Sequence, residues 1–121
     1  MSIERLNPGP RMSHAVVHAG VVYTSGHVDS AAPDVATQTK NVLARIEAVL
    51  HQAGSDKSRI LSASIWLSDI SAFAEMNAVW EGWIAPGAAP ARATVESKLA
   101  APEYKVEIAV IAAVAAQGSN G

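Results

Sequence analysis

The hydrophobic positions of this chain change period along the sequence, and each change marks an element. Two short β-branched runs, Ala15–His18 and Val21–Thr24, flank the dipeptide Ala19-Gly20. This arrangement predicts a β-hairpin with a tight turn. Residues 60–67 alternate strictly and predict a strand with at least one buried face. The alternation assigns one side to Ile60, Ser62, Ser64 and Trp66 and the other side to Leu61, Ala63, Ile65 and Leu67.

Two segments instead have helical spacing. Residues 35–53 place Val42, Ile46, Val49 and Leu50 on one face, and Gly54 follows as a natural helix end. Residues 71–84 form a second predicted helix, with Asp69 or Ser71 as its N-cap. Its apolar stripe consists of Phe73, Met76, Trp80 and Trp83.

The remaining apolar runs, 93–99 and 106–115, predict two further strands. The element order is then β-β-α-β-α-β-β, which is typical of an α+β fold with two helices packed on one face of a sheet. Residues 1–121 form one domain by this reasoning. Residues 1–11 are expected to be an irregular arm, because Asn7-Pro8-Gly9-Pro10 opposes regular structure, and residues 117–121 are expected to fray.

The last predicted strand is unusually apolar for a one-sided sheet in a small domain. An apolar sheet surface that no helix covers has to be buried in another way, and burial between subunits is the simplest. The pattern therefore predicts an oligomer.

Composition narrows the classes of function. The chain has 121 residues, a formal net charge of −2 and no cysteine. The near-neutral balance gives no reason to expect nucleic acid as a partner. Without cysteine there is neither a disulfide nor a thiolate nucleophile or metal ligand. The N-terminus lacks the apolar stretch of a signal peptide and no run is long enough to span a membrane, so a cytoplasmic protein is expected.

Two charged residues are the first candidates for chemistry. Arg92, at the predicted junction of a loop and a strand, is either a clamp for a carboxylate, which its planar fork matches, or a solvated surface arginine. Glu107 interrupts the apolar strand 106–115. It is either a carboxylate with a raised pKa, suited to acid–base chemistry, or a side chain on the open face of the sheet.

A polar group at the end of the second strand is the next candidate. Ser25 and the Gly26 amide could hold a carbonyl or a water, although an ordinary strand-ending turn is the simpler interpretation. His27 follows at a position where sites often form. The histidines, at positions 14, 18, 27 and 51, have no metal-ligand spacing, so no metal site is expected.

Several segments together resemble the RidA (YjgF) family. They are Ala15-Val16-Val17 to Tyr23-Thr24-Ser25-Gly26, Gln38-Thr39, Leu50 to Gly54, Trp66 to Trp80 with its Asp-Ile, Phe-Ala and Met-Asn pairs, Pro90-Ala91-Arg92-Ala93-Thr94, and Val106-Glu107-Ile108. These segments cover nearly the whole chain. The combination is specific, although no single segment is.

The resemblance implies a chorismate-mutase-like fold and a homotrimer whose sites lie in the clefts between subunits. It also implies hydrolysis of reactive enamine or imine acids, such as 2-aminoacrylate, to 2-keto acids and ammonia, without cofactor or metal. Arg92 falls on the family's carboxylate-binding arginine and Glu107 on the glutamate that orients or activates water. Four further positions, Ser25, Gly26, Asn77 and Thr94, fall on the pocket lining.

The chain departs from the family pattern at two places. The archetypal deaminases carry a Gly-Pro-Tyr element whose tyrosine closes the pocket, and here that place reads Arg11-Met12-Ser13. His27 stands where glutamine is common. These departures leave open a second hypothesis, a trimer that binds or senses a small carboxylate or keto acid without catalysis. A third, RNA-directed activity, is disfavoured by the near-neutral charge.

Overall fold

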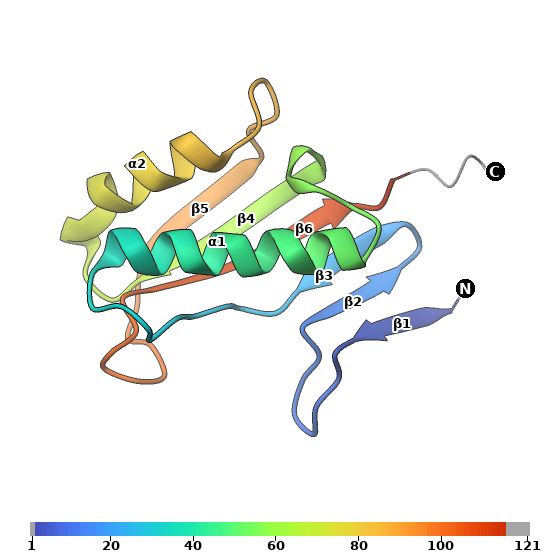
Figure 1. The fold of residues 1–121 in the computed structure, drawn as a ribbon, viewed down its shortest axis with the longest axis horizontal. Coiled ribbons are helices and arrows are strands. Elements are labelled where there is room, and N and C mark those ends of the chain that lie inside the picture. The colour runs from blue at the N-terminus through green and yellow to red at the C-terminus, as the bar shows by residue number, and fades with distance from the viewer. Residues whose placement is uncertain (1, 116–121) are drawn as a thin grey trace.

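The computed structural model describes residues 2–115 and contains a six-stranded mixed sheet with two α-helices. The strand order is β1-β2-β3-β6-β4-β5, and every pairing is antiparallel except the parallel pair β4·β5. The helices α1 (Val35–Gln52) and α2 (Phe73–Trp83) lie side by side on one face of the sheet (Figure 1). The strands are β1 (Ile3–Leu6), β2 (Ala15–His18), β3 (Val21–Thr24), β4 (Ile60–Leu67), β5 (Ala91–Glu96) and β6 (Val106–Ala113). The predicted α+β class, with both helices on one face, is confirmed.

The hairpin β2–β3 forms at the predicted turn. Ala19 and Gly20 both have positive φ, 53° and 78°. Two consecutive left-handed residues make the type of turn whose twist matches that of the flanking strands. The hairpin brings the end of β3 beside β6, and this position decides where Gly26 lies.

Helix α1 is fixed at its N-terminal end by side chains. Asp34 accepts a hydrogen bond from the Thr37 N–H at 2.9 Å. The fully buried Gln38 donates to the carbonyl oxygens of Ala32 and Glu103 at 2.8 and 2.9 Å and accepts from the Lys105 N–H at 2.8 Å. These bonds hold the start of the helix against the loop that leads into β6.

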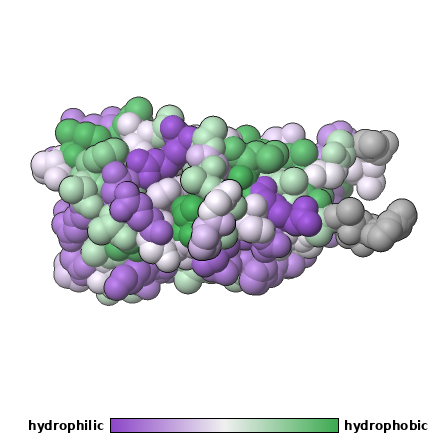
Figure 2. Space-filling model, turned by 90° about the horizontal axis from the view of Figure 1, so that it is seen from above, coloured by the Kyte–Doolittle hydropathy of each residue, from purple (hydrophilic) through white to green (hydrophobic). Residues whose placement is uncertain are grey.

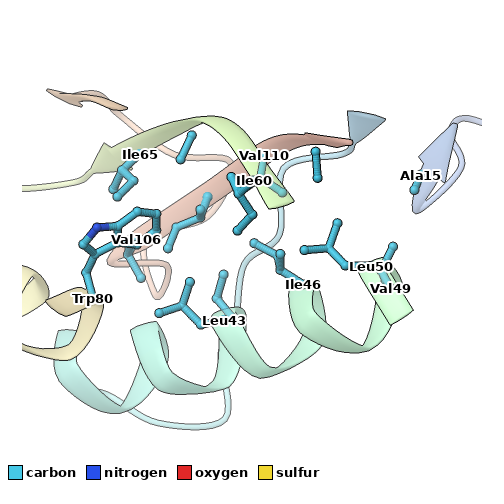
Figure 3. Packing of buried hydrophobic residues seen from close by; sticks show 14 of the residues in the cluster. Ala15, Leu43, Ile46, Val49, Leu50, Ile60, Ile65, Trp80, Val106 and Val110 are labelled. Atoms are coloured by element: carbon cyan, nitrogen blue, oxygen red, sulfur yellow. The ribbon is translucent and has the colours of Figure 1, made fainter. Parts of the chain in front are cut away.

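The core lies between the helices and the sheet (Figure 3). Leu43, Ile46 and Leu50 of α1 point toward side chains of β4 and β6, while Trp80 of α2 closes one end of the cluster. All four side chains are almost completely buried. Burying such side chains stabilises the folded state by about 1.5–3 kcal/mol each, so this interface is the main support of the fold.

Several predicted boundaries need correction. The irregular arm over residues 1–11 is wrong, because Ile3–Leu6 pairs with β2 as an edge strand, and the prolines begin only after it. The predicted strand 93–99 starts and ends earlier, at Ala91–Glu96, and α2 follows a short 3₁₀ turn at Ile70–Ala72. The predicted frayed tail, residues 117–121, lies outside the described residues.

The predicted alternation of β4 fails at its first residues. In a regular strand Leu61 would share the buried face of Ala63. Instead Ile60 is buried and Leu61 is 52% exposed. A register shift between Ile60 and Ser62, where β4 pairs with β6, explains the difference. Such an irregularity inserts a residue without a partner and turns the preceding side chain to the other face.

Candidate functional site

Arg92 lies on β5 and points toward the helices. Its strand partner is Ala63, which belongs to the buried face of β4. Its guanidinium carbon is 5.4 Å from the ring centre of Trp80 and 5.7 Å from that of Phe73. Neither of the salt bridges among the described residues involves Arg92. Arg92 is therefore a half-buried cation held by aromatic rings and not matched by a carboxylate of its own chain.

Two polar atoms on the same side of the sheet have no hydrogen-bond partner. They are Thr94 Oγ1, two residues along β5 from Arg92, and Asn77 Oδ1. Asn77 lies one helical turn after Phe73 and three residues before Trp80, so it shares their face of α2. A buried acceptor or hydroxyl without a partner costs about 1–3 kcal/mol. This cost is relieved when a ligand or a partner subunit supplies the missing group.

Glu107 lies on β6 and points away from the helices. Its neighbours Val106 and Ile108 are fully buried, and its strand partner is Trp66 on the open face of β4. The carboxylate lies against the backbone of Gly26, because a Cβ built on this glycine would lie 2.0 Å from Glu107 Oε2. Gly26 is thus the position that makes room for the acidic group.

The structure places Arg92 and Glu107 on opposite faces of the same sheet. Arg92 and Thr94 pair with Ala63 and Ile65, which face the helices, whereas Glu107 pairs with Trp66, which faces away. Alternate residues of a strand point to opposite faces, so no rotamer brings the two charged groups of one protomer together. The predicted site residues therefore form two half-sites: the arginine half-site (Arg92, Asn77, Thr94) and the glutamate half-site (Glu107, Gly26).

Ser25 and His27 lie beside Gly26 but line a different space. With Gly26 they form part of the wall of a cavity of about 410 Å³ that also includes residues of α1. His27 is only 9% exposed and its Nδ1–H donates to the Ser25 carbonyl oxygen at 2.9 Å. Burial lowers the pKa of His27 below its ordinary value. His27 pairs with Ile108, whose side chain is buried on the helix side of the sheet, so His27 and the Glu107 carboxylate lie on opposite faces.

The open face of the sheet is largely apolar. Tyr23, Val95 and Ile111 are 45%, 49% and 36% exposed, and alanines at positions 93 and 109 lie between them. Figure 2 views the molecule from the edge on which α2 and β5 lie, not onto the open face, and hydrophobic residues reach the surface at this edge among hydrophilic ones. An uncovered apolar face beside Glu107 is the surface that a second protomer would bury.

Sequence reasoning missed the aromatic support of Arg92. Phe73, Met76, Trp80 and Trp83 form the apolar stripe predicted for this helix, and Met76 and Trp80 are buried. Phe73 instead remains 39% exposed and contacts the guanidinium together with Trp80. The contact depends on the parallel pairing of β5 with β4, which the sequence alone does not reveal.

Residues 2–115 contain no cluster of three or more His, Cys, Asp or Glu side chains able to hold a metal, and no helix in that range is long and apolar enough to cross a membrane.

Comparison with known proteins gives consistent results. Residues 2–114 match the family described as endoribonuclease L-PSP. The RutC family protein YoaB of Escherichia coli (strain K12) is 45% identical over 114 residues, which are 94% of this chain and 100% of YoaB. The crystal structure of NMB1025, a YjgF family protein of Neisseria meningitidis, superposes with a TM-score of 0.94 at 44% identity, over 95% of this chain and 97% of that one. Rv2704 of Mycobacterium tuberculosis, from the YjgF/YER057c/UK114 family, gives a TM-score of 0.85 at 30% identity, over 93% and 100%.

Proposed function

The chain belongs to the YjgF/RidA (endoribonuclease L-PSP) family, and we propose that it hydrolyses reactive enamine or imine acids to 2-keto acids and ammonia. The observation that carries the proposal is the state of Arg92. A half-buried guanidinium stacked on aromatic rings, without a carboxylate of its own chain, is suited to hold the carboxylate of a small acid. Thr94 and Asn77 supply unpaired polar atoms beside it.

The second part of the proposal is that each site is shared by two protomers of a homotrimer. Arg92 and Glu107 face opposite ways in one chain, so they meet only if one protomer contributes the arginine half-site and its neighbour the glutamate half-site. The apolar open face around Glu107 supports this arrangement. In a closed ring, each interface joins one surface of a protomer to a different surface of its neighbour, which gives one such site per interface.

The chemistry requires little beyond positioning. Arg92 binds the substrate carboxylate and presents C2 of the imine tautomer. A water held by Glu107 attacks C2 of the protonated imine while the Glu107 carboxylate takes one proton from it, giving a neutral tetrahedral amino alcohol. Glu107 then gives this proton to the nitrogen, the C–N bond breaks, and ammonia leaves as the Glu107 carboxylate takes the remaining hydroxyl proton and the keto group forms. Holding water and substrate in a reactive geometry is the main contribution expected of the protein.

Asn77 and Thr94 have a defined place in this scheme. Asn77 Oδ1 accepts hydrogen bonds, so it suits the N–H of an imine or enamine. Thr94 Oγ1 can donate to a carboxylate oxygen next to Arg92. Both atoms are buried and unpaired in the single chain.

Subunit complementation tests the proposal. The variants R92A and E107Q are each expected to lose keto-acid and ammonia release from enzymatically generated 2-aminoacrylate. When equal amounts are unfolded together and refolded, random mixing should restore about a quarter of the wild-type activity, because an interface retains both residues only when the right variant lies on each side. Recovery of this fraction of the activity requires that Arg92 and Glu107 act together and that they come from two different protomers.

Three results separate the possible failures. If the mixture stays inactive while each variant forms trimers, the two residues do not meet across an interface. If R92A alone retains full activity, the carboxylate clamp is wrong. If the wild-type protein releases no ammonia yet binds pyruvate in an Arg92-dependent way, the chain is a binder of small acids. The segment Arg11-Met12-Ser13, which offers no tyrosine to close a pocket, favours that second candidate.

A further inference from the structure

The cavity of about 410 Å³ between α1, the end of β3 and the loop before β2 contains two imidazole rings. The ring centres of His14 and His27 are 5.8 Å apart, with their planes at 64°. The residues are thirteen positions apart in sequence, and the hairpin brings them together, since the Ser25 N–H donates to the His14 carbonyl oxygen at 2.9 Å. Neither ring is needed for the reaction proposed above.

The separation of the rings matches that of two ligands of one metal ion. A metal bound at about 2.1 Å from an imidazole nitrogen lies roughly 3 Å from the ring centre. Two such rings on either side of an ion then have centres up to roughly 6 Å apart. His14 is exposed on its loop, so small ring rotations are open to it.

His27 carries the hydrogen bond that metal-ligating histidines usually make. Because the Ser25 carbonyl oxygen can only accept, the proton of neutral His27 must be on Nδ1, which leaves the lone pair on Nε2. A backbone carbonyl on the second ring nitrogen fixes tautomer and orientation in this way.

The charge around the cavity does not oppose a cation strongly. Arg45 also lines it, but its guanidinium is paired with the almost fully buried Asp29. The thioether of Met12 lines the same cavity, and imidazole with thioether is a ligand set that copper accepts well. The described residues offer no third His, Cys, Asp or Glu ligand in a cluster, so water would complete the coordination.

We propose that His14 and His27 bind one copper ion per chain in this cavity. Cu²⁺ is the strongest binder of nitrogen and oxygen ligands among the divalent first-row ions, so a failure to bind it would exclude a site for the weaker-binding ions as well. The site shares only Gly26 with the glutamate half-site of the proposed reaction, and its occupancy can be measured without any substrate.

Calorimetric titration of the full chain with CuCl₂ tests this proposal, with the variants H14A and H27A and the double variant H18A/H51A as control. The wild type and the control should bind one ion with equal affinity. H14A and H27A should each lose at least about 10- to 100-fold in affinity, the loss seen when even an outer partner of a metal ligand is removed. The electron paramagnetic resonance spectrum should show two imidazole nitrogens in the wild type and one in H14A.

The outcome is decisive even if H27A fails to fold. His14 is exposed, so H14A leaves the core intact and decides the question alone. Equal Cu²⁺ affinity in H14A and wild type would overturn the proposal. The same conclusion follows if H18A/H51A abolishes binding, because the ion would then be held by surface histidines, or if the wild type binds no Cu²⁺ at all.

Discussion

Replacing Gly26 with alanine should disable catalysis while leaving the fold nearly unchanged. The added Cβ would lie 2.0 Å from Glu107 Oε2 and 2.9 Å from its carboxyl carbon. Ordinary van der Waals contact begins at 3.4 Å, so the carboxylate must move by about 1.4 Å, the difference between 3.4 and 2.0 Å. The atom displaced is the end of a flexible side chain, and Gly26 is not among the positive-φ glycines, so the backbone tolerates the change.

The kinetic consequence follows from the role proposed for Glu107. A displacement of about 1 Å in a catalytic group can cost on the order of 10²-fold in rate. We therefore expect kcat to fall at least about 100-fold. KM should change little, because Arg92 on the other half-site still binds the carboxylate, and an interaction made only in the transition state affects kcat alone. The free energy of unfolding should change by less than about 1 kcal/mol.

The assay couples ammonia release from generated 2-aminoacrylate to a glutamate dehydrogenase readout, and urea unfolding is measured on the same samples. Gly82→Ala is the matched control, since a Cβ there meets nothing within 4 Å. This helical substitution should keep wild-type kcat and raise stability by about 0.5–1 kcal/mol. Wild-type kcat in G26A would show that the position of Glu107 against Gly26 is irrelevant to the reaction.

Three further predictions follow from other contacts. Arg92→Lys loses the fork and the aromatic stacking, so KM should rise about 10- to 100-fold with a smaller effect on kcat, measured by initial rates; an unchanged KM would contradict bidentate binding. Ile111→Asp puts a charge on the apolar open face, so sedimentation should show a folded monomer without activity, and an intact trimer would mean that this face is not the interface. Hydrogen bonds from Asn41, then from Arg45, lower the pKa of Asp29, so its stabilising effect of about 1–3 kcal/mol is present above the ordinary carboxyl pKa of about 3.9 and is lost as the pH falls through the lowered value. The difference in unfolding free energy between wild type and Asp29→Asn should accordingly be largest near pH 7 and shrink below about pH 4, and a difference independent of pH would refute it.

The hydrophobic pattern predicted most of the fold because local periodicity determined most elements. The hairpin β2–β3, helix α1 and strand β6 form where their patterns placed them. The misses occurred where tertiary pairing overrides the pattern. Strand β1 is short and stands at the sheet edge, where pairing on one side with β2 is enough to order it. The shift at Ile60 depends on how β4 meets β6, which no local signal encodes.

The site was predicted less completely, for a different reason. Motif resemblance selected Arg92 and Glu107, but a strand pattern without pairing information does not say which faces they share. The register Ala63↔Arg92 and Trp66↔Glu107 resolves this, and it turns a supposed pair into two half-sites. For Glu107, the sequence left an apolar-pocket carboxylate and an open-face side chain equally possible. The structure places it on the open face, where Gly26 leaves room for its carboxylate.

The division into half-sites changes what activity depends on. If each site needs two protomers, activity per chain must fall as the trimer dissociates, even though every residue remains correctly folded in the monomer. In the proposed trimer the open face is part of the catalytic apparatus, because the exposed Tyr23, Val95 and Ile111 would lie in the interface that brings Arg92 and Glu107 together. Specific activity should therefore be constant at high protein concentration and decline below the dissociation constant of the trimer, in parallel with the sedimentation coefficient. The opposed faces of the sheet keep Arg92 and Glu107 of one chain apart, so a specific activity that stays constant through dissociation would refute the shared site.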